Sequence, residues 1–181
     1  MRAIYLRTEY LMKPLGLGTA QPRFYWNCDD GLRQTAYHIV CARNAETVWD
    51  SGKVVSQNMT HIAYGGRPLQ SRDRVCWRVH LWDENDQPGE WNKSWFELGL
   101  LRPEDWQAKW ITGDYTPKKN TRYLADCFRK TFAAGKSIAQ ARLYITACVL
   151  YEAVLNGQRV GNFQLAPGST DYRKRIQYQT Y

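Results

Sequence analysis

The feature that most constrains the fold is the lack of sustained helical periodicity, because the first hundred residues form short alternating segments separated by turn residues. The clearest segment is Arg74 to Trp82, in which Val75, Trp77, Val79 and Leu81 alternate with more polar residues. Residues two apart in a strand point to the same side. The segment therefore predicts a half-buried strand with Trp77 in the core, and the whole pattern predicts an all-β sandwich.

Other segments of similar character predict the remaining strands of this sandwich. Between them lie Asp, Asn, Ser and Gly residues, which favour turns. The composition supports a packed core, because 44% of the residues are hydrophobic and the chain has 8 Trp and 12 Tyr. The predicted strands are Arg23 to Cys28, Thr35 to Ala42, Val48 to Asp50, His61 to Tyr64 and Trp95 to Gly99.

The sequence changes character near Pro103, which predicts a domain boundary. We therefore expect a first β-sandwich over residues 1–104 and the start of a second one over residues 105–181. The second stretch is shorter than the roughly 100 residues of a complete sandwich. We expect it to be truncated, with exposed strand edges through which copies of the chain could self-associate.

Longer strands are predicted in this second module, at Tyr123 to Phe132 and at Ala141 to Leu155. Asn156-Gly157 follows the second of these, and Asn-Gly is the preferred pair for a two-residue type I′ turn. A β-hairpin is therefore predicted at this point. Another strand is expected around Ile176 to Thr180, where the alternation begins again.

The formal net charge of +8 raises the question of nucleic acid or anionic membrane partners. The basic residues are scattered, and the densest group, Arg173, Lys174 and Arg175, is too short for a nucleic-acid-binding arm. We interpret this group as a solvated face. No segment is long enough to span a membrane. With the basic residues scattered, we expect neither a nucleic acid nor a membrane as partner.

The five cysteines predict a reduced, cytoplasmic protein. Their number is odd, none are spaced as a CxxC pair or as zinc ligands, and three lie in apolar strand-like runs. Charges at Arg2, Arg7 and Glu9 interrupt the apolar residues at the start, where a signal peptide would need a continuous apolar run.

No catalytic, metal or cofactor site is expected from the residues. Hydrolysis of a glycoside needs two opposed carboxyl groups, and the acidic pairs at Asp29-Asp30, Glu84 with Asp86, and Glu104-Asp105 fall in predicted turns or linkers. We expect turn-forming or capping roles for them. The three histidines, His38, His61 and His80, have no nucleophile motif around them, and we expect structural or exposed positions.

Asp171 and Tyr172 are the candidate carbohydrate-binding residues, because they lie beside the Pro167-Gly168 turn and combine a polar with an aromatic side chain. The alternative is that the Asp171 carboxylate caps the turn and that the Tyr172 ring packs against its surroundings.

A set of motifs follows in a specific order along nearly the whole chain. It includes Pro22-Arg-Phe-Tyr-Trp26, Val48-Trp-Asp-Ser-Gly52, Cys76-Trp-Arg-Val-His-Leu-Trp-Asp83, Leu150-Tyr-Glu-Ala-Val-Leu-Asn-Gly157 and Leu165-Ala-Pro-Gly-Ser-Thr-Asp171. Together they resemble the amino-terminal region of bacterial α-L-rhamnosidases, glycoside hydrolases that commonly carry β-sandwich modules before an (α/α)₆ barrel.

The resemblance implies a fibronectin type III-like first module and a jelly-roll-like second module. It also implies that the catalytic acid and base lie on a downstream barrel, since no position here matches them. The chain is then an accessory region, inactive alone, that supports the fold and contacts rhamnose-containing glycans. Alternatives are a free-standing carbohydrate-binding protein and a fibronectin-like protein-interaction module. Val75 takes the place of the tyrosine-corner Tyr, so that hydrogen bond should be absent.

Overall fold

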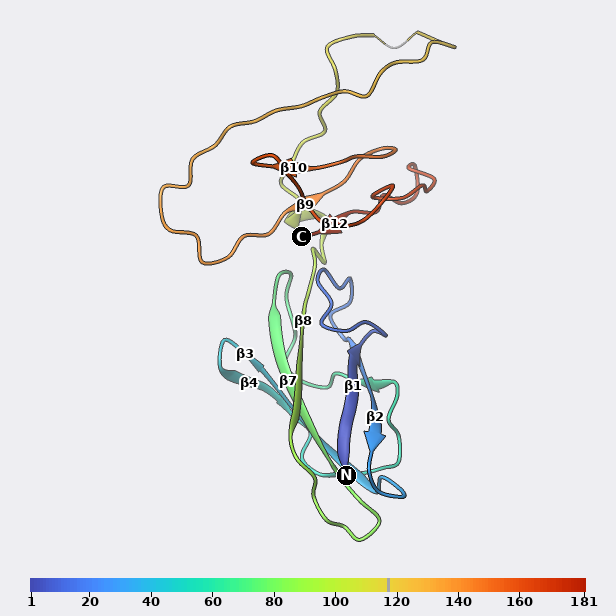
Figure 1. Ribbon diagram of the computed structural model, residues 1–181, viewed down its shortest axis with the longest axis vertical. Helices are drawn as coiled ribbons and strands as arrows, with labels where there is room; N and C mark the ends of the chain where they lie inside the picture. Colours follow the sequence, from blue (N-terminus) through green and yellow to red (C-terminus); the bar gives the residue numbers. More distant parts are fainter. Residues whose placement is uncertain (117) are drawn as a thin grey trace.

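The computed structural model describes residues 1–116 and 118–181, and Figure 1 shows two bodies that lie end to end. The lower body is a compact β-sandwich built from the first hundred residues. The upper body holds short strands and a long loop that swings far to one side. Pro117 lies outside the described residues.

The smaller sheet of the sandwich has three strands. Strand β1 (Arg2–Thr8) pairs antiparallel with β2 (Arg23–Asp29), and β2 pairs on its other side with the short β6 (Ile62–Ala63). The register of β1 shifts between Ile4 and Arg7, which marks a β-bulge. Strand β1 was not predicted, because the bulge and its charged residues break the alternation of apolar side chains.

The larger sheet has five strands, with the order β4 (Glu46–Asp50), β3 (Ala36–Arg43), β7 (Arg74–Trp82) and β8 (Asn92–Glu97). The two-residue β5 (Val54–Val55) pairs with the beginning of β3. All of these pairs are antiparallel. Figure 1 shows β7 and β8 along the length of the sandwich, with the chain passing down β7 and back up β8 toward the upper body.

The core lies between the two sheets and contains the residues that the alternation predicted. Trp77 is 1% exposed, and its ring packs against Phe24, with the ring centroids 4.6 Å apart. Buried Trp26 donates its indole N–H to the Gln34 side-chain oxygen over 2.9 Å, which satisfies the polar atom. The core also holds Ala3, Leu17, Tyr37, Ile39, Cys41, Val48, Tyr64, Leu69, Val75, Val79, Leu81, Phe96 and Leu98.

The all-β fold class is confirmed, and β7 has the predicted bounds. Strand β8 begins and ends earlier than expected. Its end is set by Leu98, which leaves the ladder and forms an isolated bridge with Leu17. Val75 is fully buried and carries no hydroxyl. The buried Tyr64 instead donates its hydroxyl to the Arg67 carbonyl oxygen over 2.8 Å, which closes a nearby loop.

The second module contains little regular structure. After the 3₁₀ turn η1 (Pro103–Asp105), β9 (Tyr144–Ile145) pairs with β12 (Gln179–Thr180). Strands β10 (Val154–Leu155) and β11 (Gln158–Arg159) form a hairpin.

The hairpin confirms the prediction made from Asn156-Gly157. Asn156 has a φ of +51° and Gly157 a φ of +81°. A type I′ turn requires positive φ at both of these positions. The turn residues therefore determine this local structure even where the surrounding module is open.

Two strand predictions in the second module were wrong. Tyr123 to Phe132 contains no strand, and only Tyr144–Ile145 and Val154–Leu155 form strands within Ala141 to Leu155. Tyr123 to Phe132 lies without a neighbouring strand, and the paired parts of Ala141 to Leu155 are only two residues long each, so most backbone groups of these segments have no ladder partner. Apolar alternation alone does not make a strand, because a strand requires a second one to pair with.

The five cysteines are free thiols. Cys41 is buried in the core and acts there as a small apolar residue. Cys28 is half-buried, and Cys76, Cys127 and Cys148 are exposed. Burial raises the pKa of the Cys28 thiol, so this cysteine stays protonated at neutral pH.

Candidate functional site at the junction of the two modules

Several long-range hydrogen bonds connect the sandwich to the second module. The backbone N–H of Leu100 donates to the Tyr178 hydroxyl over 2.6 Å, which ties the end of the sandwich to the segment before β12. The Asp105 carboxylate accepts from the Ser71 hydroxyl, and this bond lowers the pKa of Asp105. Arg72 donates to the Asp105 carbonyl oxygen over 3.0 Å. The two modules are therefore joined by directional bonds.

A buried ion pair, Glu97–Arg142, holds the other side of the junction. Arg142 Nε lies 2.6 Å from Glu97 Oε1, and Arg142 Nη2 lies 2.8 Å from Glu97 Oε2. The Glu97 side chain is 3% exposed and the Arg142 side chain 22%. Two parallel hydrogen bonds of this kind fix the orientation of both groups.

An apolar cleft of about 300 Å³ opens beside these contacts. Trp106, Trp110 and Tyr178 supply aromatic rings to its wall, and the Trp106 and Tyr178 centroids are 5.7 Å apart. Trp110 is 60% exposed, so one of the rings is open to solvent. Exposed aromatic faces with polar groups nearby could stack on a sugar ring.

Asp171 and Tyr172, the predicted sugar-binding residues, lie outside this cleft. The Asp171 carboxylate accepts from Arg173, with Oδ1 3.2 Å from the backbone nitrogen and 3.0 Å from Nε. The Arg173 guanidinium lowers the pKa of Asp171. The Asp171 carbonyl oxygen also accepts from the N–H groups of Lys174 and Arg175. Asp171 thus organises the turn, Tyr172 is half-buried, and their contact with sugar stays a prediction.

The acidic residues of the first sandwich form the expected turn and loop contacts. Asp29 pairs with Arg2, with Oδ2 2.6 Å from Nη2. Glu84 Oε2 accepts from the N–H groups of Leu32 at 3.1 Å and Arg33 at 3.3 Å. Its own backbone N–H first, and then these two, lower the pKa of Glu84. These carboxylates therefore serve the fold.

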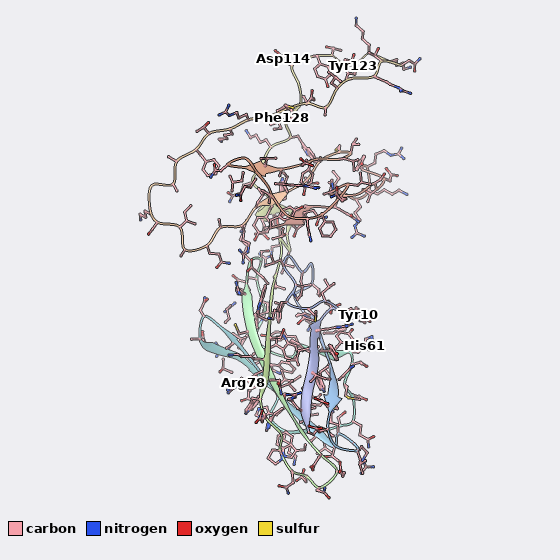
Figure 2. All side chains as sticks on the ribbon, viewed as in Figure 1. Tyr10, His61, Arg78, Asp114, Tyr123 and Phe128 are labelled. Atoms are coloured by element: carbon pink, nitrogen blue, oxygen red, sulfur yellow. The ribbon has the colours of Figure 1, made fainter. Side chains whose placement is uncertain are left out.

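The three histidines also make structural contacts. His38 Nε2 lies 2.6 Å from Asp50 Oδ1, and the His80 ring stacks on Trp91 with centroids 4.1 Å apart. Figure 2 shows Tyr10 and His61 together on one flank of the sandwich, where the Tyr10 hydroxyl lies 2.9 Å from His61 Nε2.

The described part of the chain contains no group of three or more His, Cys, Asp or Glu side chains able to hold a metal ion. No helix within it is long and apolar enough to cross a membrane.

The junction residues were not found as a site from the sequence. Arg142 follows Glu97 by 45 residues, and Tyr178 follows Leu100 by 78, so no local spacing links these pairs. The only available signal was the aromatic content around Trp106 and Tyr178, which strands use equally for core packing.

Two family descriptions match the chain. Residues 3–102 match the Rha78A-like N-terminal immunoglobulin domain, and residues 136–181 match the alpha-L-rhamnosidase N-terminal domain. An alpha-L-rhamnosidase of Formosa agariphila is 37% identical over 96% of this chain, and the match covers 20% of that relative.

Solved structures give the same result. An alpha-L-rhamnosidase from Dictyoglumus thermophilum is similar over 100% of this chain and 23% of its own, with 33% identity and a TM-score of 0.85. An alpha-L-rhamnosidase from Aspergillus terreus is similar over 99% of this chain and 21% of its own, with 31% identity and a TM-score of 0.80. The chain spans about a fifth of the length of the curated relatives it matches.

The sandwich, the second module and the order of the two thus agree with one family. The chain belongs to the Rha78A-like N-terminal immunoglobulin domain family and corresponds to the amino-terminal region of α-L-rhamnosidases.

Proposed function

We propose that this chain is the non-catalytic accessory region of an α-L-rhamnosidase, whose catalytic part hydrolyses terminal α-L-rhamnosides. Its role is to complete and support the fold around that part. The observation that carries the proposal is the open state of the second module, which presents apolar side chains and unpaired backbone to solvent.

This module exposes many large apolar side chains, and contiguous exposed apolar surface on a domain usually marks a site of interaction. Leu124 is 94% exposed and Phe132 70%. Figure 2 places Tyr123 and Phe128 on the long outer segment, well away from the first sandwich. Trp110, Ile111, Ile138, Val149, Leu150, Val154, Leu155, Phe163 and Leu165 are also exposed.

Further β-strands supplied by the rest of a longer polypeptide would cover this surface and pair with the extended segments. The similarity supports this arrangement, because the Dictyoglumus thermophilum enzyme matches the entire chain, open module included, within a much longer one.

The accessory role predicts no hydrolysis by the 181 residues alone. A glycosidase needs two carboxyl groups about 5–9.5 Å apart across a substrate cleft. Asp29, Glu84 and Asp105 instead form hydrogen bonds within the fold. The test is release of nitrophenol from an aryl α-L-rhamnoside by the purified chain. The expected rate equals that of buffer, and release at an enzymatic rate would overturn the proposal.

A second candidate function is carbohydrate binding, which the aromatic walls of the apolar cleft favour. Calorimetry with L-rhamnose and with a rhamnoside tests it, using Trp110→Ala for the cleft and Asp171→Ala with Tyr172→Ala for the turn. Saturable heat that Trp110→Ala abolishes would assign binding to the cleft. If only the turn variants abolish the saturable heat, sugar binding is assigned to the turn. Absence of saturable heat in the unaltered chain would reject carbohydrate binding as a function.

We also propose that open strand edges let copies of the chain associate, since β4 and β8 end the larger sheet and the second module is unclosed. Sedimentation velocity over a concentration series should show a rising mean mass. A strictly monomeric species at the highest concentration would contradict this. A fibronectin-like role toward another protein would use the same edges.

We propose the cytoplasm as the location of the protein, and the free state of all five cysteines supports it. Fractionation of the producing cell with an antibody against the first sandwich tests this. Recovery outside the cytoplasmic fraction would refute it.

A further inference from the structure

We propose that a second cleft at the junction, the arginine cleft, binds an oxyanion carried by a sugar, either a carboxylate or a sulfate ester. The cleft has a volume of about 550 Å³ and lies where the ends of β3, β7 and β8 meet the segment before β9. Four arginines but only two carboxylates line it. These residues are Arg43, Arg72, Arg74 and Arg142, with Asp73 and Glu97.

The two carboxylates are each engaged by an arginine. Arg43 Nη1 lies 2.7 Å from Asp73 Oδ2, and Arg142 donates two hydrogen bonds to the Glu97 carboxylate. Asp73 Oδ2 accepts in addition from the Gln70 backbone N–H at 2.8 Å. These bonds fix the positions of Arg43 and Arg142 and leave no free carboxylate to neutralise the other arginines.

Arg72 and Arg74 are held by aromatic rings. The Arg74 guanidinium lies 4.2 Å from the Trp95 ring centroid, and the Arg72 guanidinium lies 5.5 Å from that of Tyr144. Within the described ranges, neither has a carboxylate oxygen inside 4.0 Å. Stacking on a ring orients the guanidinium plane while leaving its N–H groups free to donate. Arg72 uses Nη2 for the Asp105 carbonyl oxygen at 3.0 Å, so its remaining N–H groups and those of Arg74 are available to a ligand.

The cleft therefore carries more positive than negative charge in a concave site, with Arg74 paired to no carboxylate and Arg72 bonded to a backbone carbonyl oxygen. A guanidinium offers parallel N–H donors that match the two oxygens of a carboxylate or sulfate, which is why arginine recognises these groups better than lysine. A positive cleft attracts an anion, repels a cation and exerts little net force on a neutral ligand, so selectivity should follow charge first.

Other polar groups in the wall suit a sugar. Asn44 and Gln140 line the cleft with amide groups, and Tyr144 presents an aromatic ring. The Tyr144 hydroxyl is buried and has no hydrogen-bond partner among residues 1–116 and 118–181. The volume falls in the range of about 300–1,000 Å³ that small-ligand sites occupy, enough for one or two sugar rings.

The sugar part of this proposal rests on the proposed function, and the anion part does not. The test is calorimetry on the full chain at low ionic strength with sodium glucuronate, glucose 6-sulfate, inorganic sulfate and neutral glucose. We expect saturable heat with the first two ligands and none with glucose. Sulfate alone should bind more weakly than the sulfated sugar.

The matched variants are Arg72→Gln and Arg74→Gln, with Arg129→Gln as the control. Arg129 is exposed on the long outer segment, away from the cleft. Loss of one charge-assisted bond should weaken binding about tenfold or more in the cleft variants and leave Arg129→Gln unchanged. Circular dichroism confirms that each variant is folded.

Equal affinity in Arg74→Gln and Arg129→Gln, or no heat with any anion, would overturn the proposal. Binding of inorganic sulfate as tight as that of glucuronate and the sulfated sugar would reject the sugar and keep the anion site. Hydrolysis of a rhamnoside by the chain would refute the proposed function and remove the support it gives to the sugar, while the anion site would stand.

Discussion

Replacing Arg142 by Met should destabilise the first sandwich, although Arg142 belongs to the second module. Glu97 lies at the end of β8 with its side chain 3% exposed, and Arg142 is its ion-pair partner. Met keeps most of the apolar stem and removes the charge. The substitution leaves a buried carboxylate unpaired, which typically costs about 3–5 kcal/mol. Because Arg142 is 22% exposed and water can reach the vacated position, we expect the lower value, about 3 kcal/mol.

Urea unfolding, followed by tryptophan fluorescence and circular dichroism, measures this effect. With a slope of about 2 kcal/mol per molar urea, a loss of about 3 kcal/mol lowers the midpoint by about 1.5 M. The control is Arg67→Met, which breaks the Arg67–Glu46 pair, whose side chains are 62% and 59% exposed. An exposed pair contributes about 1 kcal/mol or less, so this midpoint should move little.

The double variant Glu97→Met with Arg142→Met separates charge from packing. Removing both charges leaves no unpaired buried group, so most of the stability should return. The reasoning is refuted if Arg142→Met shifts the midpoint no more than Arg67→Met does. It is equally refuted if the double variant is as unstable as the single one, because packing would then dominate.

Three further predictions concern the sandwich and the hairpin. Burial lowers the pKa of His80 in the folded chain. As the pH drops below about 6.5, the unfolded chain therefore binds a proton at this residue before the folded chain does, and the free energy of unfolding decreases. In His80→Gln the urea midpoint should therefore fall less between about pH 8 and about pH 5.5, and an equal fall would contradict this. A Cβ at Gly66 would collide with the Val48 carbonyl oxygen, whereas one at Gly18 meets open space. Thermal melts should show a loss of about 2 kcal/mol or more for Gly66→Ala and within about 0.5 kcal/mol for Gly18→Ala, and similar melting temperatures would disprove the clash. Gly157→Ala strains a residue with a φ of +81° by about 1 kcal/mol, which should speed hydrogen exchange of the Val160 amide about fivefold. Unchanged exchange would show that the turn tolerates a side chain.

Local patterns predicted most strands of the sandwich, because a period of two between apolar residues identifies a half-buried strand wherever it persists. Along β7, Val75, Trp77, Val79 and Leu81 are all buried, as the alternation required. The Asn156-Gly157 turn was equally predictable, since its two positive φ values are a property of two adjacent residues.

The second module and the junction were less predictable because they depend on distant partners. Phe128 and Phe132 lie in a segment with the alternation of a strand, but the described chain supplies no strand beside them. The arginine cleft gathers Arg43, Arg74 and Arg142 from three separate stretches of sequence. Only the tertiary fold brings such residues together, so no spacing rule could have found them.

The Glu97–Arg142 pair also sets an order of events during synthesis of the protein. The strands and the apolar core of the sandwich are complete once the first hundred residues have emerged, so this body can fold while the ribosome is still working. Arg142 follows Glu97 by 45 residues, which at roughly 5–20 residues per second takes roughly 2–9 s. For that interval the nascent sandwich contains a carboxylate without its cation. Once Arg142 has been added, its ion pair stabilises a sandwich that has already folded. The rate of translation between Glu97 and Arg142 therefore determines how long the less stable nascent sandwich is exposed to chaperones and proteases.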